Sequence, residues 1–422
     1  MRATGEEGAA FDLRDAGFMW AAGIEDTFVA APHPRTGRVL DEYALTEHYE
    51  RWEEDLRLLA SLGVRTARYG IPWYRVCPGP GRYDWRWTDA VLERMVRDHG
   101  IEPILDLVHY GTPTWMERAF DDPDYPARVA EYAHAVAERY RGLVRWYTPL
   151  NEPRINAWYA GRLGWWPPYG RTPRAFCRVL LQLCRGICLT QRAIADAQPN
   201  AVLVHVDATD LYVAAEPDLR TVADLRQHIV FLALDLVTGR VGPGHPLVHW
   251  LRGHGASDHD LAWFREHAVR PHVIGYNMYP MFSRKEVRRR GGRTQVRIVP
   301  CWTETLDALT RLYARRYAPS PLMLTETASL GAAARRVRWI RDSARAIGGL
   351  RADGVPVIGY TFWPLYSLVA WAYQRGERPL DDYLIDMGLW DLRRGVGGLK
   401  RVATPAVEAY REAVAAGPPA GA

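Results

Sequence analysis

The stretch PLMLTET, residues 321–327, is a short apolar run that ends in a glutamate between two threonines. Its length suits one buried β-strand, and the amphipathic stretch that follows it has the length of a helix. A strand followed by a helix is the repeating unit of α/β proteins with parallel sheets. The fold therefore depends on how many times the chain repeats this unit.

The same unit recurs along the whole chain. Seven further apolar runs alternate with helical patterns such as HYERWEEDLRLLASLG, and they cover residues 17–24, 64–71, 102–110, 144–152, 201–208, 272–280 and 355–363. Eight such units are the number found in a (β/α)8 barrel, the TIM barrel. We therefore predict an α/β fold with a single (β/α)8 barrel domain over residues 1–422, with flexible ends at 1–16 and 413–422.

The predicted strands end in polar and aromatic residues, unlike the Val, Ile and Leu that precede them. These strand-end residues are Arg68, His109, Asn151 with Glu152, Asn277 with Tyr279, Glu326 and Trp363. In a barrel of this kind the carboxyl ends of the strands meet at one mouth, where the chemistry occurs. A single polar residue there is as well explained by a loop or a cap, but the pattern at six strand ends favours a shared site.

Two of the strand ends carry a glutamate, Glu152 on the fourth strand and Glu326 on the seventh. Cleavage of a glycosidic bond needs one carboxylic acid that protonates the leaving oxygen and one carboxylate that faces the anomeric carbon. Arg68 and Tyr279 at neighbouring strand ends would keep Glu326 ionised. The negative charge of Glu326 would in turn raise the pKa of Glu152, as a general acid requires at neutral pH.

The triplet Thr-Glu-Thr also occurs at residues 303–305. This copy opens the helical pattern TETLDALTRLYARRY, so Glu304 would lie in the first turn of a helix and interact favourably with the helix dipole. We therefore expect a structural role for Glu304 and a chemical role for Glu326.

Composition restricts the classes of partner. The formal net charge of +5, from 54 basic and 49 acidic residues, gives no reason to expect nucleic acid. Seventeen Trp and 22 Tyr against 9 Phe fit either a stacking surface for sugars or aromatic packing in the core. The arginine-rich segment 284–297 is interpreted as a solvated loop in preference to a site for phosphate or an acidic substrate.

The cysteines and the first residues of the sequence provide evidence on the cellular compartment. The five cysteines have no metal-ligand spacing, and Cys177, Cys184 and Cys188 recur at helical spacing, as small apolar residues on one helix face would. The first residues lack a basic start with an apolar core, and no run is long enough to cross a membrane. We expect a cytoplasmic protein with no membrane partner, and the sequence gives no oligomeric state.

The catalytic motifs resemble those of glycoside hydrolase family 1, the retaining β-glucosidases and 6-phospho-β-glycosidases. TPLNEP (148–153) is similar to the acid/base motif of that family, and LTET (324–327) stands where the family has its nucleophile motif, usually ITENG. The resemblance runs in the same order from FMW at 18 to GLWDL at 388–392. It implies a (β/α)8 barrel, Glu152 as acid/base, Glu326 as nucleophile, a covalent glycosyl intermediate with retention, and no metal or organic cofactor.

Other segments resemble the parts of that family that bind substrate. RYGIPWYRV implies an active-site role for Arg68, LVHYGTP implies sugar binding by His109, and VIGYNMY implies that Tyr279 holds the nucleophile. FWPLYSLVAW resembles the segment with two sugar-contacting tryptophans, here Trp363 and Trp371. The full expected substrate-binding set is Arg68, His109, Asn151, Asn277, Tyr279, Trp363 and Trp371.

The departures from the family pattern concern the sugar-binding side. The first strand, AAGIEDTF, lacks the usual Gln, and Ala370 replaces the Glu that usually precedes the second tryptophan. Each lost hydrogen bond to a charged group costs on the order of one to three kcal/mol, so recognition of glucose or galactose should weaken. Tyr110 replaces a Trp, while Thr327 and Ala328 replace the Asn and Gly after the nucleophile.

We therefore expect a β-glycosidase for an atypical or modified sugar. Glu25 or Asp26 either replaces part of the missing contacts or is an ordinary surface acid. The Trp-rich segment YAGRLGWWPPYG either stacks an aromatic or apolar aglycone or packs around a proline turn. Two other functions stay open: a transglycosidase that passes the same intermediate to an alcohol, and an inactive sugar-binding homologue.

Overall fold

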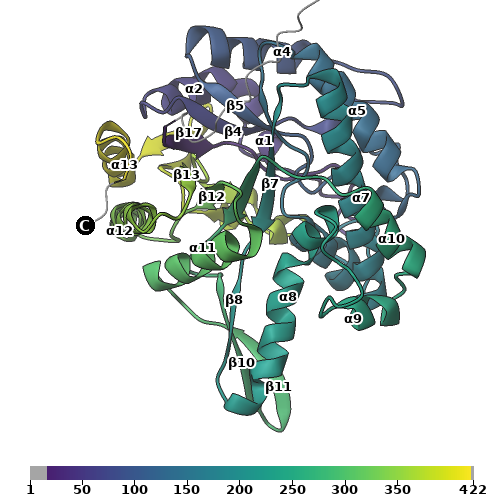
Figure 1. Ribbon diagram of the computed structural model, residues 1–422. Helices are drawn as coiled ribbons and strands as arrows, with labels where there is room; N and C mark the ends of the chain where they lie inside the picture. The colour runs from purple at the N-terminus through teal and green to yellow at the C-terminus, as the bar shows by residue number, and fades with distance from the viewer. Residues whose placement is uncertain (1–16, 420–422) are drawn as a thin grey trace, which may run out of the picture.

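The computed structural model describes residues 17–419, and their central feature is a closed barrel of eight parallel strands (Figure 1). The strand order around the barrel is β1-β13-β12-β9-β7-β6-β5-β4, which follows the order of these strands along the chain. The barrel strands are β1 (Met19–Gly23), β4 (Thr66–Gly70), β5 (Glu102–Asp106), β6 (Trp146–Thr148), β7 (Val202–Ala208), β9 (Val273–Asn277), β12 (Leu322–Thr327) and β13 (Val357–Phe362). Each lies within one of the eight predicted runs, so the predicted fold is confirmed.

Helices lie between successive barrel strands and surround the barrel (Figure 1). The longer ones are α2 (His48–Ala60), α4 (Arg86–Glu93), α5 (Tyr125–Arg139), α7 (Pro173–Ala197), α8 (Arg220–Val237), α10 (Asp258–Glu266), α11 (Thr303–Tyr317), α12 (Ala333–Ala352) and α13 (Pro405–Ala415). Shorter ones are α1 (Glu42–Leu45), α3 (Trp73–Val76), α6 (Pro153–Ala157) and α9 (Val248–Gly253), with π-helical turns η1 (Arg94–Asp98) and η3 (Trp158–Leu163) and 3-10 turns η2 (Ala119–Asp121), η4 (Pro217–Leu219), η5 (Trp371–Arg375) and η6 (Leu380–Tyr383).

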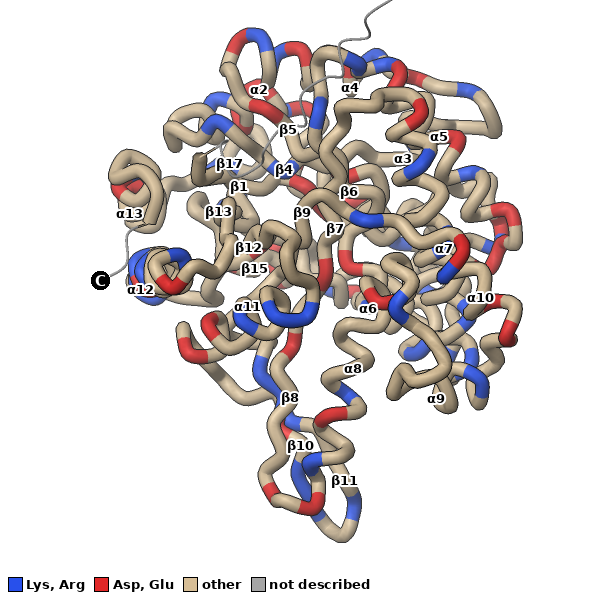
Figure 2. Tube along the Cα trace, viewed as in Figure 1, with Lys and Arg blue, Asp and Glu red and all other residues tan. Residues whose placement is uncertain are grey.

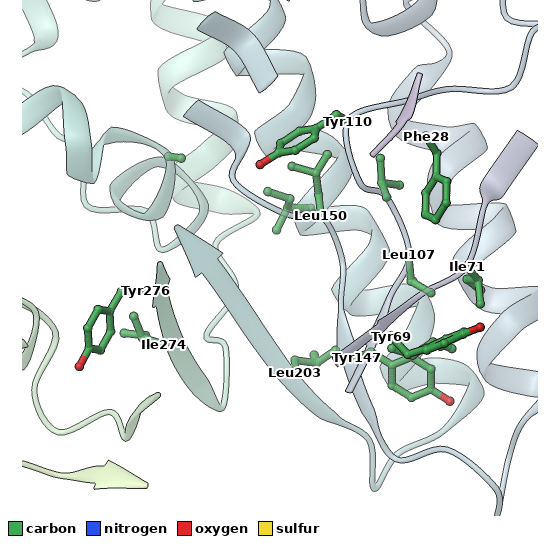
Figure 3. Packing of buried hydrophobic residues seen from close by; sticks show 14 of the residues in the cluster. Phe28, Tyr69, Ile71, Leu107, Tyr110, Tyr147, Leu150, Leu203, Ile274 and Tyr276 are labelled. Carbon is green, nitrogen blue, oxygen red and sulfur yellow. The ribbon is translucent and has the colours of Figure 1, made fainter. Parts of the chain in front are cut away.

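Two hydrophobic layers follow from the alternation of side chains along the strands. Inside the barrel, Val202, Val204 and Val206 of β7 pack against residues of the other strands, such as Met323. The intervening residue Leu203 faces outward and joins the large cluster between strands and helices (Figure 3). Because successive strand residues point to opposite faces, one apolar run supplies both layers.

Short strands outside the barrel extend the loops at several barrel strands. They are β2 (Phe28–Val29), β3 (Leu40–Asp41), β8 (Leu211–Ala214), β10 (Arg284–Arg290), β11 (Arg293–Ile298), β14 (Leu368–Val369), β15 (Leu384–Ile385), β16 (Trp390–Gly395) and β17 (Gly398–Ala403). The pair β2–β3 follows β1 directly, so it places residues of the first barrel loop next to the end of β5.

The arginine-rich segment is a β-hairpin, so its interpretation as a loop is wrong. β10 pairs with β11 antiparallel and with β8 parallel, and this three-stranded arm projects from the barrel beside α8 (Figure 1). Val287 of β10 is fully buried against Leu219 and Ala223, while basic residues recur along the hairpin (Figure 2). One buried valine between charged residues gives a weak strand pattern, which explains why the sequence did not reveal it.

The remaining predictions on the fold have mixed outcomes. Helix α13 continues to Ala415 and Trp20 Nε1 donates to the Gly417 carbonyl oxygen at 2.8 Å, so the flexible end does not begin at 413. Residues 1–16, the other predicted flexible end, lie outside the described part. Glu304 is in the first turn of α11, as predicted, and the five cysteines are buried and unpaired. Within residues 17–419 no helix is both long and apolar enough to span a bilayer.

Candidate active site

Arg68, near the end of β4, is the centre of the site. Its guanidinium group is fully buried, and Nη1 donates to Glu326 Oε1 at 2.7 Å. Nη2 donates to Asp106 Oδ2 at 2.6 Å and to Asn151 Oδ1 at 3.1 Å. Nη1 also forms an ion pair with Glu25 Oε1 at 2.8 Å. One arginine therefore organises groups from β5, β6, β12 and the loop after β1.

Glu326 lies at the end of β12, where two donors face its carboxyl group. Arg68 contacts one oxygen, and the hydroxyl group of Tyr279 donates to Oε2 at 2.7 Å. Both contacts were expected from the strand-end positions, and the structure brings both residues to Glu326. Because an arginine and a hydroxyl group both donate, the carboxyl group they hold is in its acceptor form, the carboxylate.

Glu152 follows β6 in a left-handed backbone conformation, with φ 47°, immediately before Pro153 opens α6. A non-glycine residue in this region is uncommon and marks a constrained position. Its Oε1 accepts from Asn277 Nδ2 at 2.8 Å, and its Oε2 accepts from the hydroxyl group of Tyr110. One residue at the end of β9 and one in the loop after β5 thus fix the carboxyl group at the barrel mouth.

The pKa of Glu152 is raised to about 8. Burial is the main cause and the negative charge of Glu326 is the second, while Tyr110, Asn277 and Arg154 act in the opposite direction. The sequence predicted the direction from the charge of Glu326 alone. The structure adds burial as the larger effect, so the carboxyl group of Glu152 keeps its proton to a higher pH than an ordinary glutamate does.

Asn151 and His109 form a second layer behind the carboxyl groups. Asn151 Nδ2 lies 3.0 Å from His109 Nε2, and His109 Nδ1 lies 3.2 Å from Asp106 Oδ2. Since Arg68 can only donate, the Asn151 oxygen faces it and the amide NH2 group faces His109. His109 therefore carries its ring proton on Nδ1, toward Asp106.

Asp106 and Glu25 belong to the site although the sequence did not identify Asp106 and left Glu25 open. Asp106 ends the run EPILD, and this strand-end position is the signal that could have identified it. Glu25 and Asp26 are both buried, so they are not surface acids. The pKa of Glu25 is well above its usual value because of burial, although Arg68 opposes the shift.

The two expected tryptophans occupy different surroundings. Trp363 donates from Nε1 to the Glu25 carbonyl oxygen at 2.7 Å and its ring lies 6.1 Å from that of Tyr279. Trp371 donates from Nε1 to Thr27 Oγ1 at 3.0 Å and packs edge-on against Trp166 at 4.9 Å. The indole N–H groups of both tryptophans are therefore already hydrogen-bonded to the first barrel loop.

The Trp-rich segment after β6 has two parts. Trp166 is almost fully buried and stacks on Tyr159 at 4.8 Å, as the packing interpretation expects. Trp165 is half-buried, with the guanidinium group of Arg375 at 4.1 Å from its ring centroid. No group of three or more His, Cys, Asp or Glu side chains that could hold a metal ion occurs within residues 17–419.

Comparison with known proteins identifies the family. The model for glycosyl hydrolase family 1 matches residues 20–221, which include Arg68, His109 and Glu152. This part of the chain belongs to glycosyl hydrolase family 1. Its low similarity to the relatives below marks it as divergent.

Two curated relatives show the extent of the similarity. The chain is 35% identical over 193 residues to a bifunctional β-D-glucosidase/β-D-fucosidase of Bifidobacterium breve, covering 42% of this chain and 41% of that protein. It is 26% identical over 418 residues to thermostable β-glucosidase B of Thermobispora bispora, covering 88% and 83% of the two chains. The stronger identity is thus confined to less than half of each protein.

Solved structures of the family 1 β-glucosidase from Thermotoga maritima share the fold of this protein. The complex with glucoimidazole has a TM-score of 0.82 at 18% identity and covers 94% of this chain and 98% of that one. The complex with deoxynojirimycin has a TM-score of 0.80, also at 18% identity and with the same coverage. The overall fold therefore matches over most of both chains despite the low identity.

Proposed function

We propose that this protein is a retaining β-glycosidase that acts by double displacement, with Glu326 as nucleophile and Glu152 as acid/base. The single observation that carries the proposal is the contrast between the two carboxyl groups. Glu326 is held by Arg68 and Tyr279, both at 2.7 Å, whereas Glu152 is buried and its pKa is raised to about 8. Two carboxyl groups in opposite protonation states are what this mechanism requires.

In the first displacement, protonated Glu152 gives its proton to the glycosidic oxygen while the bond from that oxygen to the anomeric carbon breaks. An oxygen of Glu326 forms the new bond to the anomeric carbon, and the alcohol leaves. Arg68 and Tyr279 orient the carboxylate for attack.

In the second displacement, the ionised Glu152 takes a proton from water, and the water oxygen attacks the anomeric carbon. The ester bond to Glu326 breaks and the sugar leaves with the anomeric configuration of the substrate. If an alcohol replaces water at this step, the same residues catalyse transglycosylation.

We propose that the other residues expected at the site surround the sugar or hold the residues that contact it: His109, Asn151, Asn277, Tyr279, Trp363 and Trp371. Arg68 contacts protein carboxyl groups on every side described above and is fully buried, so its role is to hold Glu326. In this proposal Arg68 interacts with protein groups alone, and the sugar is contacted by the residues around it.

We propose that the sugar itself is atypical. Ala370 provides only a methyl group where family members have a carboxylate, and Trp371 directs its indole N–H to Thr27. A Cβ atom at Gly23 would lie 2.5 Å from Glu25 Oε2, so the Glu25 carboxyl group fills space beside the strand that lacks the usual Gln. A deoxygenated sugar, or one with an apolar substituent, fits a site that has lost polar partners better than glucose does.

The proposal is tested with a panel of aryl β-glycosides that differ in the sugar. We expect cleavage of at least one modified glycoside and weak or no cleavage of the plain β-glucoside. With the best substrate, Glu326→Ala should lose turnover by a factor of 10⁴ or more, on the order expected when a nucleophile is removed. Full turnover by that variant, or strong activity on the β-glucoside, would contradict the nucleophile or the sugar assignment respectively.

Stereochemistry and product composition provide two further readouts. The product observed first by proton NMR should have the β configuration, and an α product would contradict double displacement. A glycosylated alcohol formed in preference to the free sugar at a low alcohol concentration would identify transfer as the main reaction. Glu304→Ala serves as the control for Glu326→Ala, because Glu304 lies at the exposed start of α11.

A further inference from the structure

Tyr110 has a hydroxyl group that lies between Asn151 and Glu152. The Tyr110 oxygen accepts from Asn151 Nδ2 at 2.9 Å, and the hydroxyl group donates to Glu152 Oε2. The ring is buried among the residues of the large hydrophobic cluster, where Figure 3 shows it near Leu150. Family members usually have a Trp at this position, and an indole ring has no group that can both accept and donate.

Arg68 determines which group donates and which accepts in each of these hydrogen bonds. Arg68 has only donors, so the Asn151 oxygen must face Nη2, at 3.1 Å. The amide NH2 group of Asn151 therefore faces the Tyr110 oxygen. Because Tyr110 already accepts from Asn151, its own proton is directed at Glu152.

The other oxygen of Glu152 faces a donor that is fixed in a similar way. Thr325 Oγ1 donates to Asn277 Oδ1 at 2.7 Å, so the Asn277 NH2 group faces Glu152 Oε1 at 2.8 Å. Both oxygens of Glu152 are therefore acceptors, an arrangement that favours a carboxylate over a carboxylic acid. Of the two donors only the Tyr110 hydroxyl group can redirect its proton without moving a heavy atom, because turning the Asn277 amide would break its bond with Thr325.

The backbone holds Tyr110 in place. Its φ is 70°, in the left-handed region that few non-glycine residues occupy. On either side the chain is bound to the first barrel loop, because Phe28 N donates to the His109 carbonyl oxygen at 3.1 Å and a Cβ atom at Gly111 would lie 1.7 Å from the Phe28 oxygen. The ring packs edge-on against His109 at 4.6 Å.

We propose that Tyr110 is a positioning residue for the acid/base: its hydroxyl group stabilises the ionised form of Glu152 that acts as base, and it turns away when Glu152 carries a proton. In the first displacement the proton leaves Glu152 for the glycosidic oxygen, and the Tyr110 hydroxyl group then donates to the new carboxylate. In the second displacement that hydrogen bond holds the carboxylate toward the attacking water until it takes a proton. This role rests on the proposed function of Glu152.

Other groups around Glu152 influence the pKa of its carboxyl group together with Tyr110. The charged and titratable groups that face it are Glu326 on β12, Arg154 on α6, Tyr110 after β5, Tyr279 after β9 and Tyr159 on η3. Burial raises the pKa of the Tyr110 phenol well above its usual value, so Tyr110 stays protonated and is a donor over the working pH range. Only Tyr110 combines a hydrogen bond to Glu152 with freedom to reorient it.

The first test measures the resting protein and needs no turnover. Glutamate labelled with 13C at the side-chain carboxyl group reports the titration of Glu152, whose signal is assigned by its loss in Glu152→Gln. Tyr110→Phe removes one hydrogen bond to the carboxylate, so we expect the pKa of Glu152 to rise by about one unit. Tyr147→Phe is the matched control, because it removes a buried hydroxyl group that donates to Gln198 at 2.9 Å. An unchanged or lower pKa in Tyr110→Phe would overturn the inference.

The second test uses an aryl glycoside with a good leaving group, for which the second displacement limits kcat. Tyr110→Phe should lower kcat about tenfold and lower KM in proportion, because the glycosyl intermediate accumulates. The alkaline limb of the kcat/KM profile should move to higher pH, and azide, which needs no base, should restore kcat. Equal losses in kcat and kcat/KM with no azide effect would indicate a merely structural role. Absence of wild-type turnover on every substrate would overturn the proposed function, while the NMR titration would still decide the role of Tyr110.

Discussion

At the scale of single residues, the main feature is one arginine with three buried carboxyl groups. Arg68 contacts Glu25, Asp106 and Glu326 at 2.8, 2.6 and 2.7 Å, and the side chains of Arg68, Glu25 and Asp106 are fully buried. Three carboxylates and one guanidinium group would leave two uncompensated charges out of water, at a cost of several kcal/mol for each ion. Burial raises the pKa of Glu25 well above its usual value, although Arg68 opposes the shift, so Glu25 binds a proton more readily than an ordinary glutamate.

Replacement of Arg68 should therefore lower the free energy of unfolding by more than the loss of its own hydrogen bonds. We expect Arg68→Met to lower the free energy of unfolding by about 3–5 kcal/mol at pH 7, because it leaves the carboxyl groups without a counter-ion. Urea unfolding followed by circular dichroism measures this difference.

The double variant Arg68→Met/Glu25→Gln separates the charge effect from the packing effect. With one carboxyl group fewer, it should be more stable than Arg68→Met alone, so the two substitutions should not be additive. Additive losses would show that Glu25 does not interact with Arg68 in the way described.

At the scale of elements, the first barrel loop locks the loop after β5. The hairpin β2–β3 approaches so closely that only glycine fits at position 111, where a Cβ atom would lie 1.7 Å from the Phe28 carbonyl oxygen. The hydrogen bond from Phe28 N to the His109 oxygen joins the same two segments. Tyr110 and His109 thus depend on a contact between parts of the chain about 80 residues apart.

Gly111→Ala should move this loop and lower both stability and activity. Forced overpacking typically costs about 1–3 kcal/mol, and displacement of Tyr110 should lower kcat tenfold or more. Gly349→Ala is the matched control: Gly349 lies in α12 with open space around its Cβ position, so alanine should stabilise the helix by about 0.5–1 kcal/mol. Melting temperature and turnover are the measurements, and a Gly111→Ala protein as active as wild type would contradict the locked loop.

The same scale shows what the sequence could and could not predict. Apolar runs such as PLMLTET identify the barrel strands because strand length and burial leave a local pattern, and the polar residues at their ends follow from the parallel topology. Glu25 was undetermined because its burial results from contacts with β4 and the loop after β13. The arm of β8, β10 and β11 was missed because only Val287 of β10 is buried.

At the scale of the whole molecule, several buried acids hold protons that the unfolded chain would release. Burial raises the pKa of Glu42 to about 7 and that of Glu152 to about 8, and Asp26 beside Glu42 is shifted in the same direction. The pKa values of Asp55 and Asp235 are shifted in the other direction. Burial raises them, but hydrogen bonds to histidine and arginine lower them by more, so protonation of these two residues reduces stability only at acid pH.

These shifts determine how stability depends on pH. Above the unfolded value of 4.5 and below about 7, the folded protein keeps the Glu42 proton and the unfolded chain does not. Stability must therefore fall as pH rises through this window, by up to about 1.4 kcal/mol per pH unit for each such proton. The raised pKa of Glu152 lowers stability with rising pH in the same way, up to about pH 8.

Urea unfolding at pH 5, 6, 7 and 8 should show a steady loss of stability in the wild-type protein. Glu42→Gln, which keeps the shape of the side chain but has no proton to lose, should show a slope smaller by roughly 1 kcal/mol per pH unit between pH 5 and 7; equal slopes in the two proteins would mean that Glu42 is ionised in the folded state.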